Sequence, residues 1–276
     1  MVMAKVFLRK YIREIEGQVD HGQQDEAIAH CRHILRKYPK HLDTYRMLGK
    51  AYLEARRYNE ATDIFHRLLM AVPDDFVAHV GMSIINDVQQ NMDAAIWHME
   101  RAFEVQPSNS AIQSEMQRLY SRRDGVEPPK IRLTRGALSH MYVQGELYPQ
   151  AISEISGVLV EDAGRQDMQV LLARAYFHAG QKGESGEICS QLIRRYPYCL
   201  DANRVLVELL PGEEDTEKAQ VYRARVNELD PYAAFVTGSI FRSEDVPDEA
   251  VSIDHLEWDG QPVEIDADWD SSLGIG

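Results

Sequence analysis

The chain has 276 residues, of which 44% are hydrophobic and 27% are charged, a composition typical of a soluble protein with a sizeable core. No apolar run approaches the roughly 18 residues that a membrane-spanning helix needs, and the closely spaced charges near the start argue against a secretory signal. The formal net charge is −14, which argues against nucleic acid or an anionic membrane as the partner of the whole molecule.

Three cysteines, Cys31, Cys189 and Cys199, follow no metal-binding or redox spacing. An odd number of cysteines without an export signal is typical of a reducing compartment. We therefore expect a cytoplasmic protein.

Prolines divide much of the chain into units of equal length. Pro39, Pro73 and Pro107 lie 34 residues apart, and the same interval separates Pro197 from Pro231. Each proline follows a segment with helical apolar periodicity, which is where proline ends a helix. The spacing predicts an all-α protein built from repeated helix pairs.

The clearest unit covers residues 42–75. The residues that form its pattern are Tyr45, Leu48, Gly49, Tyr52, Ala61, Phe65, Leu68 and Pro73. The large residues form one apolar stripe on each of two helices, and small Gly49 and Ala61 allow these helices to approach closely. Neither helix can bury its stripe alone, so we expect the units to stack.

This pattern resembles the tetratricopeptide repeat (TPR), which has a large residue at position 4, Leu at 7, Gly at 8, Tyr at 11, Ala at 20, Phe at 24 and Pro at 32. Only Leu68 departs from it, where the family prefers a small residue. The same register fits units at residues 8–41, 42–75, 76–109, 132–165, 166–199 and 200–233.

One interruption separates the first three units from the last three. Residues 110–120 have the pattern of a lone first helix, and the Gly125 and Pro128–Pro129 region that follows cannot continue it. We expect a TPR solenoid of antiparallel helix pairs, in which two three-repeat arrays are separated by an orphan helix and a linker. The predicted domains are a first array with its trailing helix (1–121), a linker (122–131), a second array with a C-terminal cap (132–241) and an acidic, disordered tail (242–276).

No phosphate-binding loop, nucleophile elbow or zinc-binding helix is recognisable in the sequence. His30 and His33 are spaced so that they could share a metal ion, but no third ligand is suggested, and we interpret them as surface residues of a second helix. We expect no catalytic site, no metal site and no cofactor.

The TPR resemblance implies that the first helices line a concave face that binds peptides. The residues at its inward-pointing positions that we select as peptide contacts are Arg46, Lys50, Leu53, His140, Arg174, Phe177, His178 and Arg204. Acidic residues share these positions, so a mixed, solvated surface is the alternative. The family's Lys and Asn clamp for a C-terminal carboxylate is not matched, because Ile12, Glu16 and Met47 stand at its positions.

The tail combines acidic residues with tryptophan. From Ala234 onward, eleven Asp and Glu residues accompany a single Arg, and this segment also contains Trp258 in LEWD and Trp269 in DWDSSL. These short motifs resemble the tryptophan-acidic peptides that kinesin light chain TPRs bind. We expect both tryptophans to act as anchors, in this chain's own groove, in that of a neighbouring chain or in another protein, unless the tail is a linker to further sequence.

These features predict a scaffold or adaptor that binds a peptide or a partner protein in the TPR groove, with the acidic tail as a docking or autoinhibitory motif. The first alternative is a non-catalytic regulatory subunit of an enzyme complex. The second, an enzyme in its own right, would need a deep pocket with convergent polar groups.

Overall fold

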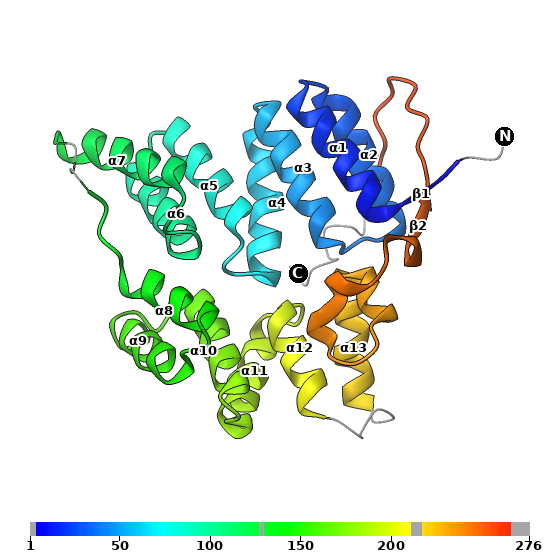
Figure 1. The fold of residues 1–276 in the computed structure, drawn as a ribbon. Helices are drawn as coiled ribbons and strands as arrows, with labels where there is room; N and C mark the ends of the chain where they lie inside the picture. The colour runs from blue at the N-terminus through cyan, green and yellow to red at the C-terminus, as the bar shows by residue number, and fades with distance from the viewer. Residues whose placement is uncertain (1–3, 127, 129, 211–216, 266–276) are drawn as a thin grey trace. The chain divides into compact units, whose positions relative to one another are not determined.

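Figure 1 shows the computed structural model, which describes residues 4–126, 128, 130–210 and 217–265. Within these residues the chain forms thirteen α-helices, three short 3-10 helices and two short β-strands. The predicted all-α architecture of helix pairs is therefore confirmed.

The elements follow one another in simple order. The α-helices are α1 (Leu8–Asp20), α2 (Gln24–Lys37), α3 (Leu42–Glu54), α4 (Tyr58–Ala71), α5 (Phe76–Val88), α6 (Met92–Val105), α7 (Ser110–Asp124), α8 (Arg135–Gln144), α9 (Tyr148–Glu161), α10 (Gln166–His178), α11 (Lys182–Arg195), α12 (Leu200–Leu209) and α13 (Glu217–Leu229). The remaining elements are β1 (Lys5–Phe7), β2 (Ser252–Asp254), η1 (Pro231–Phe235), η2 (Ile240–Asp245) and η3 (Asp248–Ala250).

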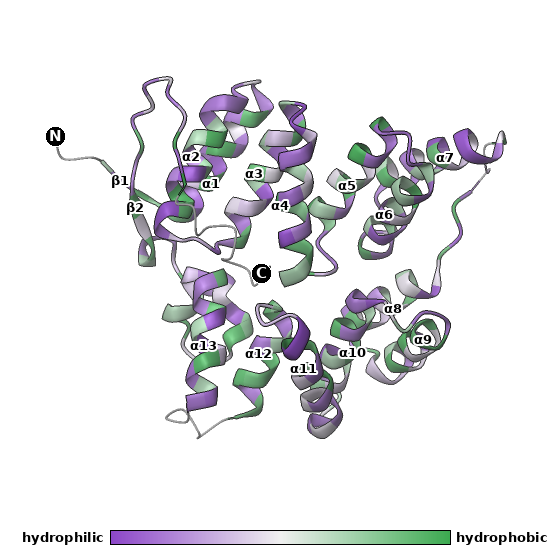
Figure 2. Ribbon diagram, turned by 180° about the vertical axis from the view of Figure 1, so that it is seen from behind, coloured by the Kyte–Doolittle hydropathy of each residue, from purple (hydrophilic) through white to green (hydrophobic). Residues whose placement is uncertain are grey.

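The helices are amphipathic, and hydrophobic and hydrophilic residues alternate along each of them (Figure 2). Local signals fix several of their starts. The Asp75 side chain accepts a hydrogen bond from the Ala78 amide at the beginning of α5, and Thr134 caps α8 in the same way through the Ala137 amide. Such caps satisfy amide groups that have no partner inside the helix.

The helices α3 and α4 meet at Gly49, as the sequence predicts. A Cβ atom added at Gly49 would lie 2.9 Å from two ring carbons of Phe65 and closer still to a third. Tyr45, Leu48 and Phe65 are all fully buried. The absence of a side chain at Gly49 is therefore what allows the Phe65 ring to lie against α3.

Other units have a hydrogen bond at the equivalent place. Ser83 on α5 donates to the Ala95 carbonyl oxygen on α6 at 2.7 Å. Ser185 on α11 donates to the Ala173 carbonyl oxygen on α10 at 2.8 Å. Both pairs occupy repeat positions 8 and 20, so in these two repeats the small residues of the register meet.

A second recurring bond links four of the repeats, and also α7, to the residues before them. The side chain at repeat position 4 donates to the main-chain carbonyl oxygen six residues earlier, at position 32 of the preceding unit. Ala163 accepts this bond where other units have proline, so the bond follows the register and not the proline ring. The pairs are Tyr45 to Pro39 (3.1 Å), His79 to Pro73 (3.0 Å), Gln113 to Pro107 (2.6 Å), Gln169 to Ala163 (2.8 Å) and Asn203 to Pro197 (2.9 Å).

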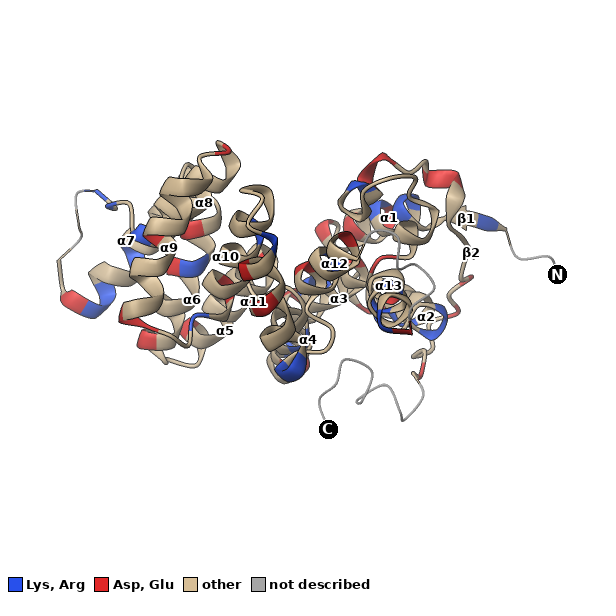
Figure 3. Cartoon of the chain, turned by 90° about the horizontal axis from the view of Figure 1, so that it is seen from below, with Lys and Arg blue, Asp and Glu red and all other residues tan. Residues whose placement is uncertain are grey.

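The chain forms two compact units. The first contains residues 1–71 and 196–276, and the second contains residues 72–195. This division differs from the predicted pair of arrays, because the C-terminal part of the chain packs with α1 and α2. In both units, Lys and Arg are interspersed with Asp and Glu on the helices (Figure 3).

In the second unit, α6 packs against both α7 and α8. Ile112 and Met116 of α7 share a buried cluster with Phe103 of α6, and Ala137 of α8 belongs to the same cluster. Gly125, with φ of 74°, ends α7 in the left-handed conformation that glycine adopts readily. Helix α7 begins at Ser110, where the sequence predicts the lone helix, and the division into two arrays and a linker stays a prediction.

The sequence predicts a disordered tail from Arg242, and the structure differs as far as residue 265. Residues 251–265, here called the strap, lie beside α1 and α2 in the first unit (Figure 1). Strand β2 pairs antiparallel with β1, with Val6 opposite Ile253. Val251, Ile253 and Val263 are buried, so aliphatic residues placed among the acidic ones hold the strap in place.

Candidate functional site

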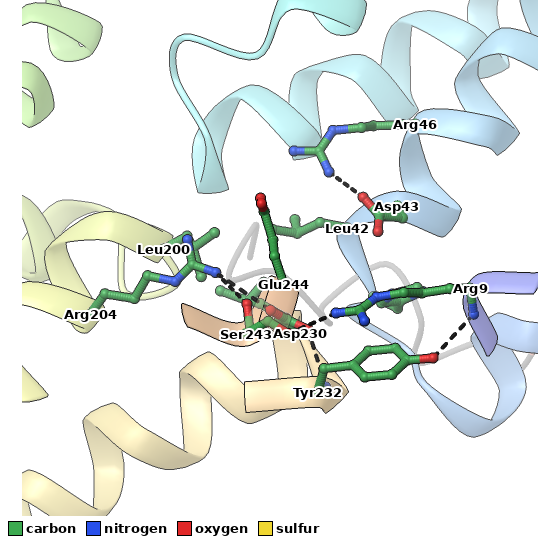
Figure 4. A pocket seen from close by; sticks show the side chains of 12 residues that line it. Arg9, Leu42, Asp43, Arg46, Leu200, Arg204, Asp230, Tyr232, Ser243 and Glu244 are labelled. Carbon is green, nitrogen blue, oxygen red and sulfur yellow. Dashed lines mark hydrogen bonds and ion pairs between the residues drawn. The ribbon is translucent and has the colours of Figure 1, made fainter. Parts of the chain in front are cut away.

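A polar pocket of about 210 Å³ lies in the first unit, lined by residues of α1, α3, α12 and the segment after α13 (Figure 4). Two predicted groove residues, Arg46 of α3 and Arg204 of α12, lie on opposite sides of it, and Glu244 extends between them. Arg46 and Arg204 belong to repeats far apart in the sequence. The fold thus brings two of the predicted contacts into one site.

Each of these arginines has a carboxylate partner. Arg46 forms an ion pair with Asp43 at 2.5 Å. Arg204 lies 3.4 Å from Asp230 and 3.6 Å from Asp201, and it also donates to the Ser243 hydroxyl at 3.4 Å. Both guanidinium groups are therefore held in position before any ligand arrives.

Arg9 is a third arginine of the pocket, and we did not select it from the sequence. Its guanidinium donates to the main-chain carbonyl oxygens of Val246 (2.6 Å) and Ser243 (2.7 Å) and lies 3.7 Å from the centre of the Tyr232 ring. Arg9 stands at position 2 of the first repeat, one of the inward-pointing positions, and this register was the signal that could have identified it.

The charges of the pocket cancel. The three arginines face three carboxylates, those of Asp43, Asp230 and Glu244. His41 also lines the pocket and is buried, and burial lowers the pKa of its ring, so His41 is neutral near pH 7. The site can bind through several charged hydrogen bonds without preferring a strongly acidic or strongly basic ligand.

Lys50 and Leu53, the other predicted contacts on α3, do not line this pocket. Lys50 forms ion pairs with Asp20 at 2.8 Å and Glu16 at 3.9 Å on α1, and it holds the pKa of Asp20 below its usual range. Leu53 is partly buried. Lys50 therefore helps to join the first two repeats.

The remaining predicted contacts lie in the second unit. His140 on α8 is buried, and its Nε2 atom has no hydrogen-bond partner among the described residues. Burial lowers the pKa of His140 to about 4. Arg174 and Phe177 on α10 are partly buried, and exposed His178 stacks on Tyr148 at 5.5 Å.

A buried ion network in the second unit was also missed. Glu104 of α6 bonds Arg165 at 2.5 Å, and Arg165 in turn bonds Asp167 of α10 at 2.6 Å. The Glu104 carboxylate also accepts from Arg101 and from Thr134 just before α8. These groups tie α6 to the residue before α8 and to the segment that follows α9. They are dispersed in sequence, so no local motif reveals them.

Trp258 lies in the strap and not in the pocket of Figure 4. It is half-buried, and its indole N–H donates to the Gln261 carbonyl oxygen at 2.9 Å. Its ring lies with Ile28, Ala29 and Arg32 of α2 around a separate pocket of about 260 Å³. Trp269, the second predicted anchor, lies outside the described residues.

His30 is not the surface residue that we expected. It is buried on α2, with its Nδ1 atom 2.6 Å from the Tyr11 hydroxyl and its Nε2 atom 3.6 Å from Glu26. Burial and the nearby His255 lower the pKa of His30. The error arose because the sequence contains no sign that the strap covers this side of α2.

Metal-binding clusters and membrane-spanning helices are both absent from the residues that the structure describes. No group of three or more His, Cys, Asp or Glu side chains in them has an arrangement suited to a metal ion. None of their helices combines the length and the apolar character required to cross a membrane.

Solved structures with a similar chain trace include pilF from Pseudomonas aeruginosa, which is 12% identical with a TM-score of 0.33, over 86% of this chain and 96% of that one. The Naa15/Naa10 complex bound to HypK-THB is 17% identical with a TM-score of 0.37, over 85% and 45% of the two chains. The APC/C hetero-tetramer Cut9–Hcn1 is 13% identical with a TM-score of 0.36, over 88% and 49%. This chain therefore spans less than half the length of the last two.

A search of curated proteins gave no match. Two profiles of the family described as Tetratricopeptide repeat match residues 18–80 and residues 167–197. The first match includes the helix pair α3 and α4, and the second covers most of the pair α10 and α11. Family profile, helix pairing and 34-residue register agree, and the chain contains tetratricopeptide repeats in these two regions.

Proposed function

We propose that this protein is an interaction scaffold, and that the pocket of Figure 4 is a contact point for a segment of a partner protein. The observation that supports this most directly is the meeting of Arg46 and Arg204 in one pocket. Both occupy first-helix positions that the TPR resemblance assigns to ligand contact.

The chemistry of the pocket indicates what kind of segment it binds. A carboxylate or main-chain carbonyl of the partner can take donors from Arg46 or Arg204, whereas an amide or a cation can bind exposed Glu244. Because the charges of the pocket cancel, we propose a polar segment of mixed charge.

A second contact point is proposed on α10 in the second unit. Arg174, Phe177 and His178 lie within one and a half turns of helix, and the His178 ring packs edge-to-face on Phe177 at 5.3 Å. Aromatic rings beside a guanidinium group are common at protein interfaces. A partner protein could use both contact points or only one.

Affinity capture with matched variants tests the proposal. Immobilised wild-type protein, the double variant Arg46→Glu/Arg204→Glu and the control Arg223→Glu are incubated with lysate, and bound proteins are quantified by mass spectrometry. Arg223 is an exposed arginine of α13 that does not line the pocket. We expect at least one protein to bind wild type and control alike and to fall about tenfold or more with the double variant.

The purified partner is then titrated by calorimetry against the same three chains, and circular dichroism confirms that each is folded. Identical captured proteins for all three chains would contradict a role for this pocket. A single stoichiometric partner with enzymatic activity would instead favour the alternative of a regulatory subunit.

A further inference from the structure

The strap is bound to α2 mainly through its main chain. Lys37 donates to the Ser252 carbonyl oxygen at 2.8 Å, and His33 Nε2 bonds the Asp254 carbonyl oxygen at 2.7 Å. At the other end of the strap, two arginines of α2 donate to carbonyl oxygens of Val263 (3.1 Å) and Glu264 (2.8 Å). Every peptide segment has such carbonyl groups, whatever its sequence.

The arginines of the second set are Arg32 and Arg36. With His33 and Lys37, they form a row of donors along one side of α2. The Tyr11 hydroxyl of α1 adds an acceptor, which receives the Leu256 amide at 3.0 Å. Together these five side chains offer both donors and an acceptor to an extended backbone.

The acidic side chains of the strap contribute little to this contact. Within the described residues, the only ion pair between a strap side chain and a helix joins His255 to Glu14 at 3.4 Å. Glu257 and Asp259 are exposed. The helices α1 and α2 therefore contact the strap through its main chain and not through its acidic side chains.

The fit between the strap and α2 is incomplete. The pocket of about 260 Å³ beside Trp258 remains between them, lined by Ile28, Arg32 and Arg57 on the helix side. Gly260, with φ of 87°, has the left-handed backbone conformation that favours glycine. Trp258 and Val263 of the strap line this space and leave it open, so another segment could fit the surface better.

We propose that this face of α1 and α2 is a docking surface for an extended segment of a partner protein, recognised through its main chain, and that the strap is a resident occupant which the partner displaces. The proposal rests on the function as an interaction scaffold and adds a further surface to the two contact points proposed above. The partner segment is strand-like, so that it pairs with β1 as β2 does, and it carries a large apolar side chain for the pocket at Ile28.

Tethering sets the conditions for displacement. A strap linked to the rest of its chain competes at an effective concentration of about a millimolar. A free peptide with the strap's own sequence should therefore displace it only near that concentration, whereas a segment that fills the pocket should do so at a lower one. A substitution within the strap weakens its contact with α1 and α2 and removes this competition, while the residues of α2 stay unchanged.

A fluorescence anisotropy titration tests the proposal on the full-length protein. The probe is a labelled peptide of wild-type residues 250–265. The variant Ile253→Asp places a charge at a strap position that is 3% exposed and opposite Val6. We expect Ile253→Asp to bind the peptide about tenfold or more tightly than wild type, because its own strap no longer competes.

Two further arms identify the surface. Adding Arg36→Gln to the Ile253→Asp chain should weaken the peptide about tenfold, through the lost charged hydrogen bond to Glu264. Arg223→Gln, the same charge change at an arginine without a hydrogen bond to the strap among the described residues, should leave affinity unchanged. A peptide with Glu257→Gln and Asp259→Asn should bind within about twofold of the wild-type peptide, because main-chain contacts are unaffected.

Hydrogen exchange on the wild-type chain gives a readout that needs no variant. Millimolar peptide should accelerate exchange at the Leu256 amide while amides inside α2 stay protected. Val263→Asp is a second variant that weakens the strap from its own side. The proposal would be overturned if neither Ile253→Asp nor Val263→Asp bound the peptide more tightly than wild type, or if exchange at the Leu256 amide did not accelerate. The pocket of Figure 4 would be untouched by that failure, because its test uses variants of Arg46 and Arg204.

Discussion

Substituting Gly49 by alanine should destabilise the protein because the new methyl group would collide with Phe65. The added Cβ would lie 2.9 Å from two ring carbons and closer to a third, whereas ordinary contact begins at 3.4 Å. Phe65 is 0% exposed, so its ring has no empty space to enter and α4 must move away from α3. Overpacking of this kind costs about 1–3 kcal/mol.

A second glycine separates the cost of the collision with Phe65 from the gain in helix propensity. Alanine is favoured over glycine inside a helix by about 1 kcal/mol, and this gain applies at both sites. A Cβ atom at Gly17, in α1, would meet nothing within 4 Å. Gly180 would be an unsuitable control, because its φ of 78° strains any substitution. We expect Gly17→Ala to stabilise slightly, and Gly49→Ala to be less stable than Gly17→Ala by about 1–3 kcal/mol.

Urea unfolding followed by far-UV circular dichroism measures both variants, with midpoints compared at equal slope. In a Phe65→Leu background, which removes the ring, the cost of Gly49→Ala should become smaller, and a double-mutant cycle gives the coupling. Equal midpoint shifts for Gly49→Ala and Gly17→Ala would refute the reasoning, because the contact between positions 8 and 24 would then carry no energetic weight.

Three further outcomes are expected. Gly136→Ala should lower the free energy of unfolding by about 1–3 kcal/mol in urea, because its Cβ would overlap the buried carboxylate of Glu104. Glu104→Gln is the comparison variant, since it leaves Gly136 unchanged and introduces no such overlap. The native state resists protonation of His140, because the pKa of its ring is lowered from 6.5 to about 4 in the folded chain. The free energy of unfolding should therefore be unaffected by this group well above pH 6.5 and should decrease as the pH falls, by about 2 kcal/mol at pH 5. His140→Gln should abolish this part of the loss. Tyr11→Phe should accelerate hydrogen exchange in the strap, whereas Tyr45→Phe, which removes a hydroxyl at the same repeat position, should not.

The repeat register could be predicted because it depends on steric rules that leave marks in the sequence. Small residues are needed where two helices touch, and proline follows a helix end, so both recur at fixed intervals. Ser83 and Ser185 occupy the small-residue position in weakly matching repeats, and both form the contact there. The Ala163 carbonyl shows that the register persists even where proline is absent.

The site could be predicted only in part. The TPR resemblance assigns inward-pointing positions to the register and so selected Arg46 and Arg204, which both line the pocket of Figure 4. It did not reveal that Arg204 approaches Asp230 and Ser243, since those partners come from the irregular segment after α13. Irregular backbone has no period, so its path cannot be read from spacing.

The strap escaped prediction for a different reason. An acidic segment with few large apolar residues has the composition of a disordered chain. Here Val251, Ile253 and Val263 are buried, and most of the polar contacts of the strap with α2 use its main-chain carbonyl groups. Amino-acid composition describes only side chains, so it gives no sign of contacts that the main chain makes.

The strap gives the first repeat a contact that other repeats obtain from their predecessor. Tyr11 stands at position 4, where Tyr45 and its equivalents donate to a carbonyl oxygen of the unit before. The segment before α1 is the strand β1, which provides no such carbonyl. Tyr11 instead bonds buried His30 at 2.6 Å and accepts the Leu256 amide of the strap at 3.0 Å. The Tyr11 hydroxyl therefore has one partner within its own repeat and a second in the strap. A partner segment that displaced the strap, as we propose, would have to present an amide to Tyr11 in place of that of Leu256, because each hydrogen bond of this kind contributes about 0.5–1.5 kcal/mol.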